Sequence, residues 1–337
     1  MKISVVITAD LRTRFIREAV QSVINQTMPR SDYEIVVVKR FDDPELDQFL
    51  RAQGCVVVPC GDVVLGAKHE LAAQRVRGDV VCILEDDDRF LPEKLERVWE
   101  AFSRDLTRVV YFHNPFTVID ESGRPAPALM LPWMRAGMSH AGNISLRGYP
   151  EGVRDLKRIR YPIEYNLSSF SLRSDVYRRA SASAKELGTE HFEPWFFYNA
   201  MITGPDVRLL SAPTVLTEYR QHSDNARRRN VNAYGWSQTL AITARNLDPF
   251  IARLKDYPLV RKEFQARQLI YQLMAEMLGR SSRRALLARA TGMLPLIRTQ
   301  AVRRRRDFLF RVFAATIIGE PVRRSYRASL TGRRESN

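Results

Sequence analysis

Residues 80–90 read VVCILEDDDRF and indicate the fold class of this chain. This stretch opens with five apolar residues, three of them β-branched, which is typical of a strand buried on both faces. Four acidic residues follow without a break: Glu85, Asp86, Asp87 and Asp88. In open α/β sheets, ligands bind just beyond the carboxyl ends of the strands. The stretch therefore predicts a buried strand that ends at a ligand site, and a solvated acidic turn is the alternative interpretation.

On either side of this stretch, short apolar runs alternate with segments of helical periodicity. The other predicted strands in the first part of the chain cover residues 3–7, 33–38, 56–58 and 109–112. The predicted helices there cover residues 15–24, 45–52, 68–76 and 92–102. This alternation predicts an α/β fold with a Rossmann-like, mostly parallel sheet and helices on both faces.

The pattern changes twice further along the chain. Residues 115–165 are rich in Pro, Gly and Met and lack periodicity, so we expect a loop-rich region. Strand and helix patterns return over residues 170–179, 191–203 and 207–210. From about residue 230 the pattern is helical throughout. We expect an α/β domain, a basic helical C-terminal region and a disordered tail, over residues 1–228, 229–330 and 331–337.

Two apolar stripes with helical spacing lie in the C-terminal region. The first consists of Ile270, Leu273, Met274, Met277 and Leu278. The second consists of Phe310, Phe313, Ala314, Ile317 and Ile318. Both stripes predict helices with one apolar face.

The net charge of +15 is concentrated in the same region. Residues 231–337 carry 21 Lys and Arg against 7 Asp and Glu, whereas residues 1–230 carry 32 against 31. Such asymmetry indicates an anionic partner, and nucleic acid and an anionic membrane surface both qualify. Four arginines at 303–306 next to the second stripe favour an interfacial helix over residues 283–327. A helical cap with solvated arginines is the alternative interpretation.

The cysteines and the apolar runs bear on the compartment. Cys55, Cys60 and Cys82 lack the spacing of zinc or redox motifs, which favours a reducing intracellular compartment. The apolar run after Lys2 is too short for a signal peptide. No stretch reaches 18 uncharged apolar residues, so we expect no spanning helix.

The acidic cluster suggests a metal. Adjacent carboxylates repel one another, and a cation relieves this repulsion. Oxygen ligands suit Mg²⁺ or Mn²⁺, with substrate phosphates completing the shell. A dication there could hold a diphosphate and stabilise charge as the bond to it breaks.

Three segments in this order resemble glycosyltransferase family 2, whose members have the GT-A fold. The first, residues 4–27, reads SVVITADLRTRFIREAVQSVINQT. The second runs from Gly66 to Asp88 and ends in Glu85-Asp86-Asp87, at the place of the family's DxD motif. The third, residues 216–225, reads LTEYRQHSDN. The resemblance covers about residues 1–228 and implies sugar transfer from a nucleotide-sugar donor to an acceptor hydroxyl.

The resemblance also assigns roles to individual residues. It implies metal or diphosphate contacts for Glu85, Asp87, Asp88 and His222, although a surface histidine in a polar loop is the alternative for His222. The implied donor contacts are Thr8, Asp10, Arg12, Lys39, Asp42, Lys68 and Asp86. The family usually has Asp where this chain has Lys39. Because lysine cannot accept hydrogen bonds, either Asp10 or Asp42 replaces that contact or Lys39 meets a phosphate.

The family's base position falls on Glu193, with Glu190 as the second candidate. A carboxylate there could take the proton of the acceptor hydroxyl during direct displacement at the sugar carbon, which the resemblance implies to be inverting. The alternative for Glu193 is an acidic residue that stabilises a helix N-terminus.

We therefore expect a cytoplasmic enzyme, peripheral to the inner membrane face, that acts in glycan or glycolipid assembly on a lipid-linked or other cell-surface acceptor. A nucleic-acid-binding protein is a competing interpretation, based on charge alone, and no RRM, KH or helix-turn-helix signature supports it. A catalytically inactive GT-A scaffold is another. Lys39 favours the inactive scaffold, and the intact acidic cluster argues against it.

Overall fold

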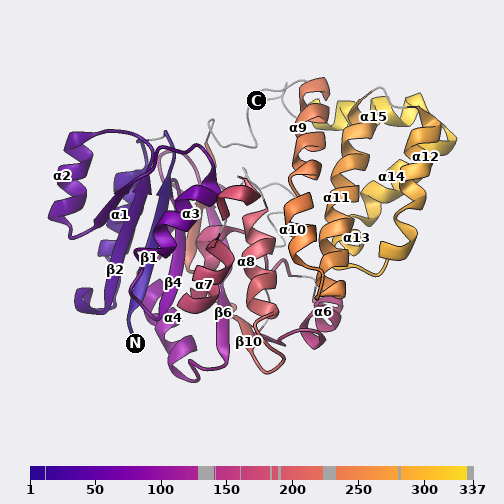
Figure 1. Ribbon diagram of the computed structural model, residues 1–337. Coiled ribbons are helices and arrows are strands. Elements are labelled where there is room, and N and C mark those ends of the chain that lie inside the picture. The colour runs from indigo at the N-terminus through magenta and orange to yellow at the C-terminus, as the bar shows by residue number, and fades with distance from the viewer. Residues whose placement is uncertain are drawn as a thin grey trace. The chain divides into compact units, whose positions relative to one another are not determined.

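The computed structural model describes residues 1–11, 13–127, 140, 142–159, 161–182, 184–188, 191–222, 233–279 and 282–331. The chain divides into two compact units, residues 1–225 and 226–337. Figure 1 shows an α/β unit that contains the N-terminus and an all-helical unit that follows it.

The N-terminal unit is built on an eight-stranded sheet with the order β3-β2-β1-β4-β9-β6-β10-β8. Its strands are β1 (Ile3–Ala9), β2 (Tyr33–Lys39), β3 (Val56–Pro59), β4 (Val80–Glu85), β6 (Val109–His113), β8 (Ile144–Arg147), β9 (Phe170–Arg173) and β10 (Arg208–Ser211). Strands β3, β2, β1 and β4 are parallel neighbours, and β9 is antiparallel to both β4 and β6. The predicted mostly parallel α/β sheet is confirmed.

Helices pack on both faces of the sheet because the central strands are apolar on both sides. Every residue of β1 is buried. Its alternate residues, beginning at Ile3, share a core with α1 (Ile16–Ile24), α2 (Pro44–Ala52) and α4 (Lys94–Ser103). The described residues of this unit also form α3 (Leu65–Ala73), α6 (Glu151–Asp155), α7 (Ser174–Ser181) and α8 (Phe192–Met201). Helix α3 contacts β1, β2 and α7, and α8 contacts α7, β6 and β10.

A second, three-stranded sheet has the order β5-β11-β7, formed by β5 (Arg89–Phe90), β11 (Thr217–Arg220) and β7 (Phe116–Ile119). Strand β11 runs parallel to β7 and antiparallel to β5. This sheet brings the third family segment against the residues that follow the acidic cluster.

The prediction of a loop-rich region over residues 115–165 was wrong in part. The described residues of that region include β7, β8 and α6. These elements are only four or five residues long, and the two strands form through pairing with distant strands rather than through a strong local pattern.

The C-terminal unit is helical, as predicted. Its helices are α9 (Ala233–Arg245), α10 (Asp248–Arg253), α11 (Pro258–Leu278), α12 (Arg283–Thr291), α13 (Gln300–Arg303), α14 (Arg306–Ile317) and α15 (Glu320–Thr331). The core includes Leu273, Met277 and Leu286 together with Val312 and Ala315. None of the helices within the described ranges is long and apolar enough to cross a membrane. The predicted disordered tail lies outside the described residues, except for Thr331 at the end of α15.

Candidate functional site

The acidic cluster lies at the carboxyl end of β4, between the two sheets. Glu85 is the last residue of the strand and is half-buried. Asp86, Asp87 and Asp88 are 3%, 7% and 0% exposed. A solvated acidic turn would leave these carboxylates in water, so that interpretation is wrong. Removing several carboxylates from water is costly unless each is hydrogen-bonded or paired with a positive charge.

Hydrogen bonds from two sides hold Asp88. Its Oδ2 accepts from the Ser168 hydroxyl at 2.6 Å, and its Oδ1 accepts from the backbone N–H of Arg220 at 2.9 Å. The Ser168 hydroxyl also accepts from the backbone N–H of Glu85 at 3.0 Å. Burial, together with the neighbouring Asp87 carboxylate, raises the pKa of Asp88 well above its usual value. Asp88 thus fastens the turn to β11 and to the short helix Leu167–Ser169.

Arg220 is fully buried beneath the same turn. Its Nε donates to the carbonyl oxygen of Asp87 at 2.8 Å, and its Nη2 donates to Glu18 at 2.6 Å. Nη1 reaches the carbonyl of Glu121 at 3.1 Å, and the guanidinium lies 4.5 Å from the centre of the Phe15 ring. The guanidinium therefore ties α1, β11 and the acidic turn together. No role for Arg220 was predicted from the sequence, in which it stands only as a charged residue within the third family segment.

His222 and Asp87 lie side by side. His222 Nε2 is 3.0 Å from Asp87 Oδ2, and the imidazole packs against Phe15 with ring centres 5.0 Å apart. His222 is 1% exposed, so it is not the surface histidine of the alternative interpretation. Within the described part of the chain, no three His, Cys, Asp or Glu side chains form a group that could hold a metal by themselves. Asp87 and His222 contact each other directly beside the acidic turn.

Several of the residues assigned to the donor lie where β1 and β2 end and where α3 begins. These are Thr8, Asp10, Lys39 and Lys68. Arg40 donates to Asp10 at 2.6 Å, and Lys68 lies 3.1 Å from the same oxygen. The hydrogen bond from Arg40, with further help from Lys68, lowers the pKa of Asp10. Thr8 pairs with Glu85 across the sheet and is buried. These groups form an ionic cluster on the strand ends next to the acidic turn.

Lys39 is buried, and its partners belong to the protein. Its Nζ lies 2.9 Å from Asp47 on α2 and 4.9 Å from the centre of the Phe41 ring. A lysine held in this way is less available to a phosphate than an exposed one. Asp42 is exposed on the loop that follows. Arg12, the remaining predicted donor contact, lies outside the described residues.

Of the two candidate bases, the structure describes only Glu193. Glu193 lies half-buried in the first turn of α8, as the helix-dipole interpretation expects, and Glu190 lies outside the described residues. The sequence analysis overlooked a third carboxylate, Glu164, which is 5% exposed. Burial raises the pKa of Tyr111 on β6, and the charges of Glu164 and Glu193 raise it further. Both carboxylates therefore act on the same buried tyrosine.

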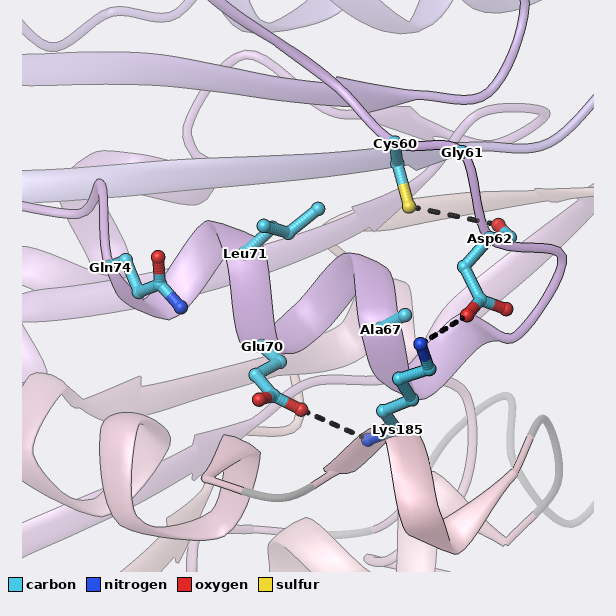
Figure 2. A pocket seen from close by; sticks show the side chains of 8 residues that line it. All are labelled: Cys60, Gly61, Asp62, Ala67, Glu70, Leu71, Gln74 and Lys185. Atoms are coloured by element: carbon cyan, nitrogen blue, oxygen red, sulfur yellow. Dashed lines mark hydrogen bonds and ion pairs between the residues drawn. The ribbon is translucent and has the colours of Figure 1, made fainter.

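A pocket of about 460 Å³ lies beside α3. Figure 2 shows its lining, which is formed by Cys60, Gly61, Asp62, Ala67, Glu70, Leu71, Gln74 and Lys185. Lys185 Nζ lies 2.9 Å from Asp62 and closes one side. Residues 67, 70, 71 and 74 share one side of the helix, whereas Lys68 projects from the other side toward Asp10. The pocket includes none of the residues predicted for the site.

Comparison with known proteins bears on this arrangement. Residues 4–153 match Glycosyl transferase family 2. A poly(ribitol-phosphate) beta-glucosyltransferase of Bacillus spizizenii is 35% identical over 112 residues, which are 31% of this chain and 18% of that protein. The match thus spans less than a fifth of the length of this relative.

Solved structures of S. aureus TarS 1-349 share the fold. The complex with UDP has a TM-score of 0.56 at 16% identity, and the complex with UDP-GlcNAc has 0.57 at 15%. In both comparisons the match covers 98% of this chain and 92% of the other. The structural similarity confirms the predicted GT-A fold, and residues 4–153 match the family predicted from the sequence.

Proposed function

We propose that this chain, whose residues 4–153 form a family 2 glycosyltransferase domain, transfers a sugar from a nucleotide-sugar donor to an acceptor hydroxyl. The observation that carries the proposal is the buried turn in which Asp87 faces His222 at the carboxyl end of β4. Ligands of open α/β sheets bind at this edge. The TarS structures with UDP and UDP-GlcNAc support a uridine diphosphate sugar as the first donor to test.

The residues of the turn fit Mg²⁺ or Mn²⁺. These ions are commonly held by one or two carboxylates, with substrate phosphates completing the shell. Asp87 and His222 would hold the ion, and Glu85, the last residue of β4, would supply a further carboxylate. When bound, the ion would stabilise negative charge on the departing diphosphate. Both oxygens of Asp88 already accept hydrogen bonds, so we give Asp88 the role of holding the turn.

The remaining roles belong to side chains around the turn. We assign Glu193 to take the proton of the acceptor hydroxyl as that oxygen displaces the nucleotide at the sugar carbon, with inversion. The cluster of Asp10, Arg40 and Lys68 lies where the donor nucleotide would approach the ends of β1 and β2. Lys39 is paired with Asp47, so we expect the donor nucleoside to be contacted by Asp10 or Asp42.

The acceptor is proposed from chemistry and from the named relative. The relative's name describes glucosyl transfer to poly(ribitol phosphate), which supports a hydroxyl-bearing cell-surface polymer or glycolipid as the acceptor here. We also propose that this chain works at the cytoplasmic membrane face, because its basic C-terminal region favours an anionic membrane surface.

A donor screen tests the proposal. The full chain is incubated with UDP-, GDP- and dTDP-sugars and Mn²⁺ or Mg²⁺, and release of free nucleotide is measured. Calorimetry with the preferred donor should show metal-dependent binding that Asp87→Ala abolishes, because the substitution removes the carboxylate beside His222. The exposed Asp256 provides the control variant Asp256→Ala, which should bind the donor normally.

Three results would contradict the assignment. Unchanged donor affinity of Asp87→Ala in the presence of Mn²⁺ would remove the metal role of the turn. Donor binding without nucleotide release, with every acceptor tried, would favour the inactive scaffold. Salt-sensitive binding of nucleic acid with no donor binding would favour the nucleic-acid alternative.

A further inference from the structure

Helix α14 (Arg306–Ile317) is apolar on two opposite sides. Val312 and Ala315 are 2% and 0% exposed and pack into the core of the C-terminal unit. Phe310, Phe313 and Ile317 are 72%, 59% and 63% exposed. Their spacing of three and four residues places these three side chains in one row along the helix, opposite the buried pair. We call this row the α14 stripe.

No residue of the α14 stripe belongs to the core that the described residues of this unit form. A helix that is apolar all round is normally buried all round. The same unit has further exposed apolar residues, with Ile318 at 55%, Leu294 at 68% and Ile297 at 60%. Large exposed apolar patches on a soluble protein mark places where it meets another surface.

Arginines lie along and beside the α14 stripe. Arg306 lies one helical turn before Phe310, on the same side of the helix, and is exposed. Arg303 and Arg305 precede it and are also exposed. From α12, which packs beside α14, Arg283 donates to the carbonyl oxygen of Ile318 at 3.0 Å. Over residues 283–327 there are 12 arginines and 2 acidic residues.

We propose that the α14 stripe and its arginines form a docking surface for an anionic lipid bilayer. Helices that lie in the membrane interface combine an apolar row that enters the headgroup boundary with Lys or Arg that meet anionic headgroups. The charge of residues 283–327 is complementary to such a surface and opposes close approach of a second, equally basic copy of the same face. The proposal concerns binding alone, and it stands or falls separately from the sugar transfer proposed above.

Vesicle sedimentation of the full chain tests the proposal. The chain should sediment with vesicles of phosphatidylcholine and phosphatidylglycerol at low salt, and less so at high salt because ions screen the attraction. It should not sediment with phosphatidylcholine alone. Phe310→Ser/Phe313→Ser should weaken binding at least about tenfold, since two apolar anchors are lost. Arg303→Gln/Arg305→Gln/Arg306→Gln should weaken it about a hundredfold.

The N-terminal unit offers matched controls. Trp99 on α4 is 41% exposed, and Arg108, Arg154 and Arg158 are exposed. Trp99→Ser and the triple Arg-to-Gln variant at 108, 154 and 158 should bind vesicles as the parent chain does. Circular dichroism of each variant reports whether it is folded. A change in the control variants equal to that in the α14 variants would overturn the proposal, because binding would then follow total charge or total apolar exposure.

Several other results would overturn it. These are absence of vesicle binding at low salt, equal binding to neutral vesicles, and unchanged binding after the two phenylalanines are replaced. Unchanged binding after the two phenylalanines are replaced would indicate that the arginines alone bind a polyanion. Soluble polyphosphate would then compete with the vesicles for the protein. An oligomer seen by sedimentation velocity, which Phe310→Ser/Phe313→Ser separates, would assign the α14 stripe to contact between copies instead. None of these experiments measures sugar transfer. A chain that binds vesicles but transfers no sugar would therefore contradict only the proposed function.

Discussion

Arg220 of the N-terminal unit is fully buried, whereas Phe310 of the C-terminal unit is 72% exposed. The same contrast holds for their neighbours. Lys94 and Asp88 are fully buried in the first unit, and Phe313 and Ile317 are largely exposed in the second. Around Arg220 the chain buries charge, and along the α14 stripe it exposes apolar side chains, each against the usual preference of those side chains.

A buried charge and an exposed apolar side chain both lower the stability of the folded chain, so we expect each of them to serve a function. A buried guanidinium is tolerated only when its donors are satisfied, and Arg220 satisfies them with Glu18 and with carbonyl groups on either side of the acidic turn. An exposed phenylalanine forgoes about 1.5–3 kcal/mol of burial. In the first unit, the hydrogen bonds of Arg220 within the protein offset the cost of burying its charge, and they hold the acidic turn in place. In the second unit nothing within the described chain buries the α14 stripe, which points to a surface outside it.

The largest expected effect is on turnover and concerns the carboxylates around Tyr111. Glu193→Gln should lower turnover by about 10²–10⁴-fold and leave donor affinity unchanged, because it removes the proposed base while keeping its volume. Glu164→Gln is the matched control, since that buried carboxylate acts on the same tyrosine. Steady-state rates and calorimetry on both variants separate the two. An active Glu193→Gln beside an inactive Glu190→Gln or Glu164→Gln would move the base to the other carboxylate.

The next effect is on stability and tests whether the buried charge is internally balanced. Arg220→Met should lower the free energy of unfolding by about 3–5 kcal/mol, because Glu18 and the carbonyls of the turn lose their donor. Arg124→Met, at a side chain that is 77% exposed, should change it by less than about 0.5 kcal/mol. Urea unfolding followed by circular dichroism measures both variants. Equal small changes would mean that Arg220 contributes nothing beyond its packing.

A smaller, pH-dependent effect concerns Lys94. Burial lowers the pKa of Lys94 to about 8, although its Nζ donates to Asn114. Between pH 8 and the usual lysine pKa of 10.5, the unfolded chain holds a proton at this position that the folded chain has released. Stability from this group therefore rises with pH across that window and is lost as pH falls through about 8.

The matching variant is Lys94→Met. The free energy of unfolding of the parent chain, relative to the variant, should rise by up to about 3 kcal/mol between pH 7 and pH 10.5. A difference that stays constant over this range would show that Lys94 remains charged in the folded chain. Urea unfolding at a series of pH values provides the measurement.

The strands that position the site could be predicted from the local sequence, whereas the contacts between side chains within the site could not. The run ending at Glu85 is apolar on both faces, so burial dictated a central strand with its carboxylates at the sheet edge. Arg220 lies 202 residues from Glu18, and no local pattern reveals such a partner. Strand β11 is polar and forms because β7 and β5 lie on its two sides. Lys39 was assigned to the donor, yet Asp47 on the next helix holds it.

The two apolar stripes of the C-terminal region show the same limit more sharply. Both have helical spacing, and both lie on helices. Four members of the first, Ile270, Leu273, Met277 and Leu278, are buried in the core. Four members of the second, Phe310, Phe313, Ile317 and Ile318, are exposed. Periodicity predicts that a helix has an apolar face, but only the packing of the neighbouring helices decides whether that face is covered.

The smallest expected effect is on stability, and it tests whether the α14 stripe is exposed in solution. Val312 and Phe310 lie on opposite sides of α14, at 2% and 72% exposure. Val312→Ala should lower the free energy of unfolding by about 2 kcal/mol, because it removes buried methyl groups and leaves a cavity. Phe310→Ala removes a far larger side chain and should change it by less than about 0.5 kcal/mol, since the ring contributes little buried area to the folded state. If Phe310→Ala proves as costly as Val312→Ala in urea unfolding, then another part of the chain covers the α14 stripe in solution. The surface proposed to meet a bilayer would then belong to the interior of the protein, and the two units would obey the same rule of burial.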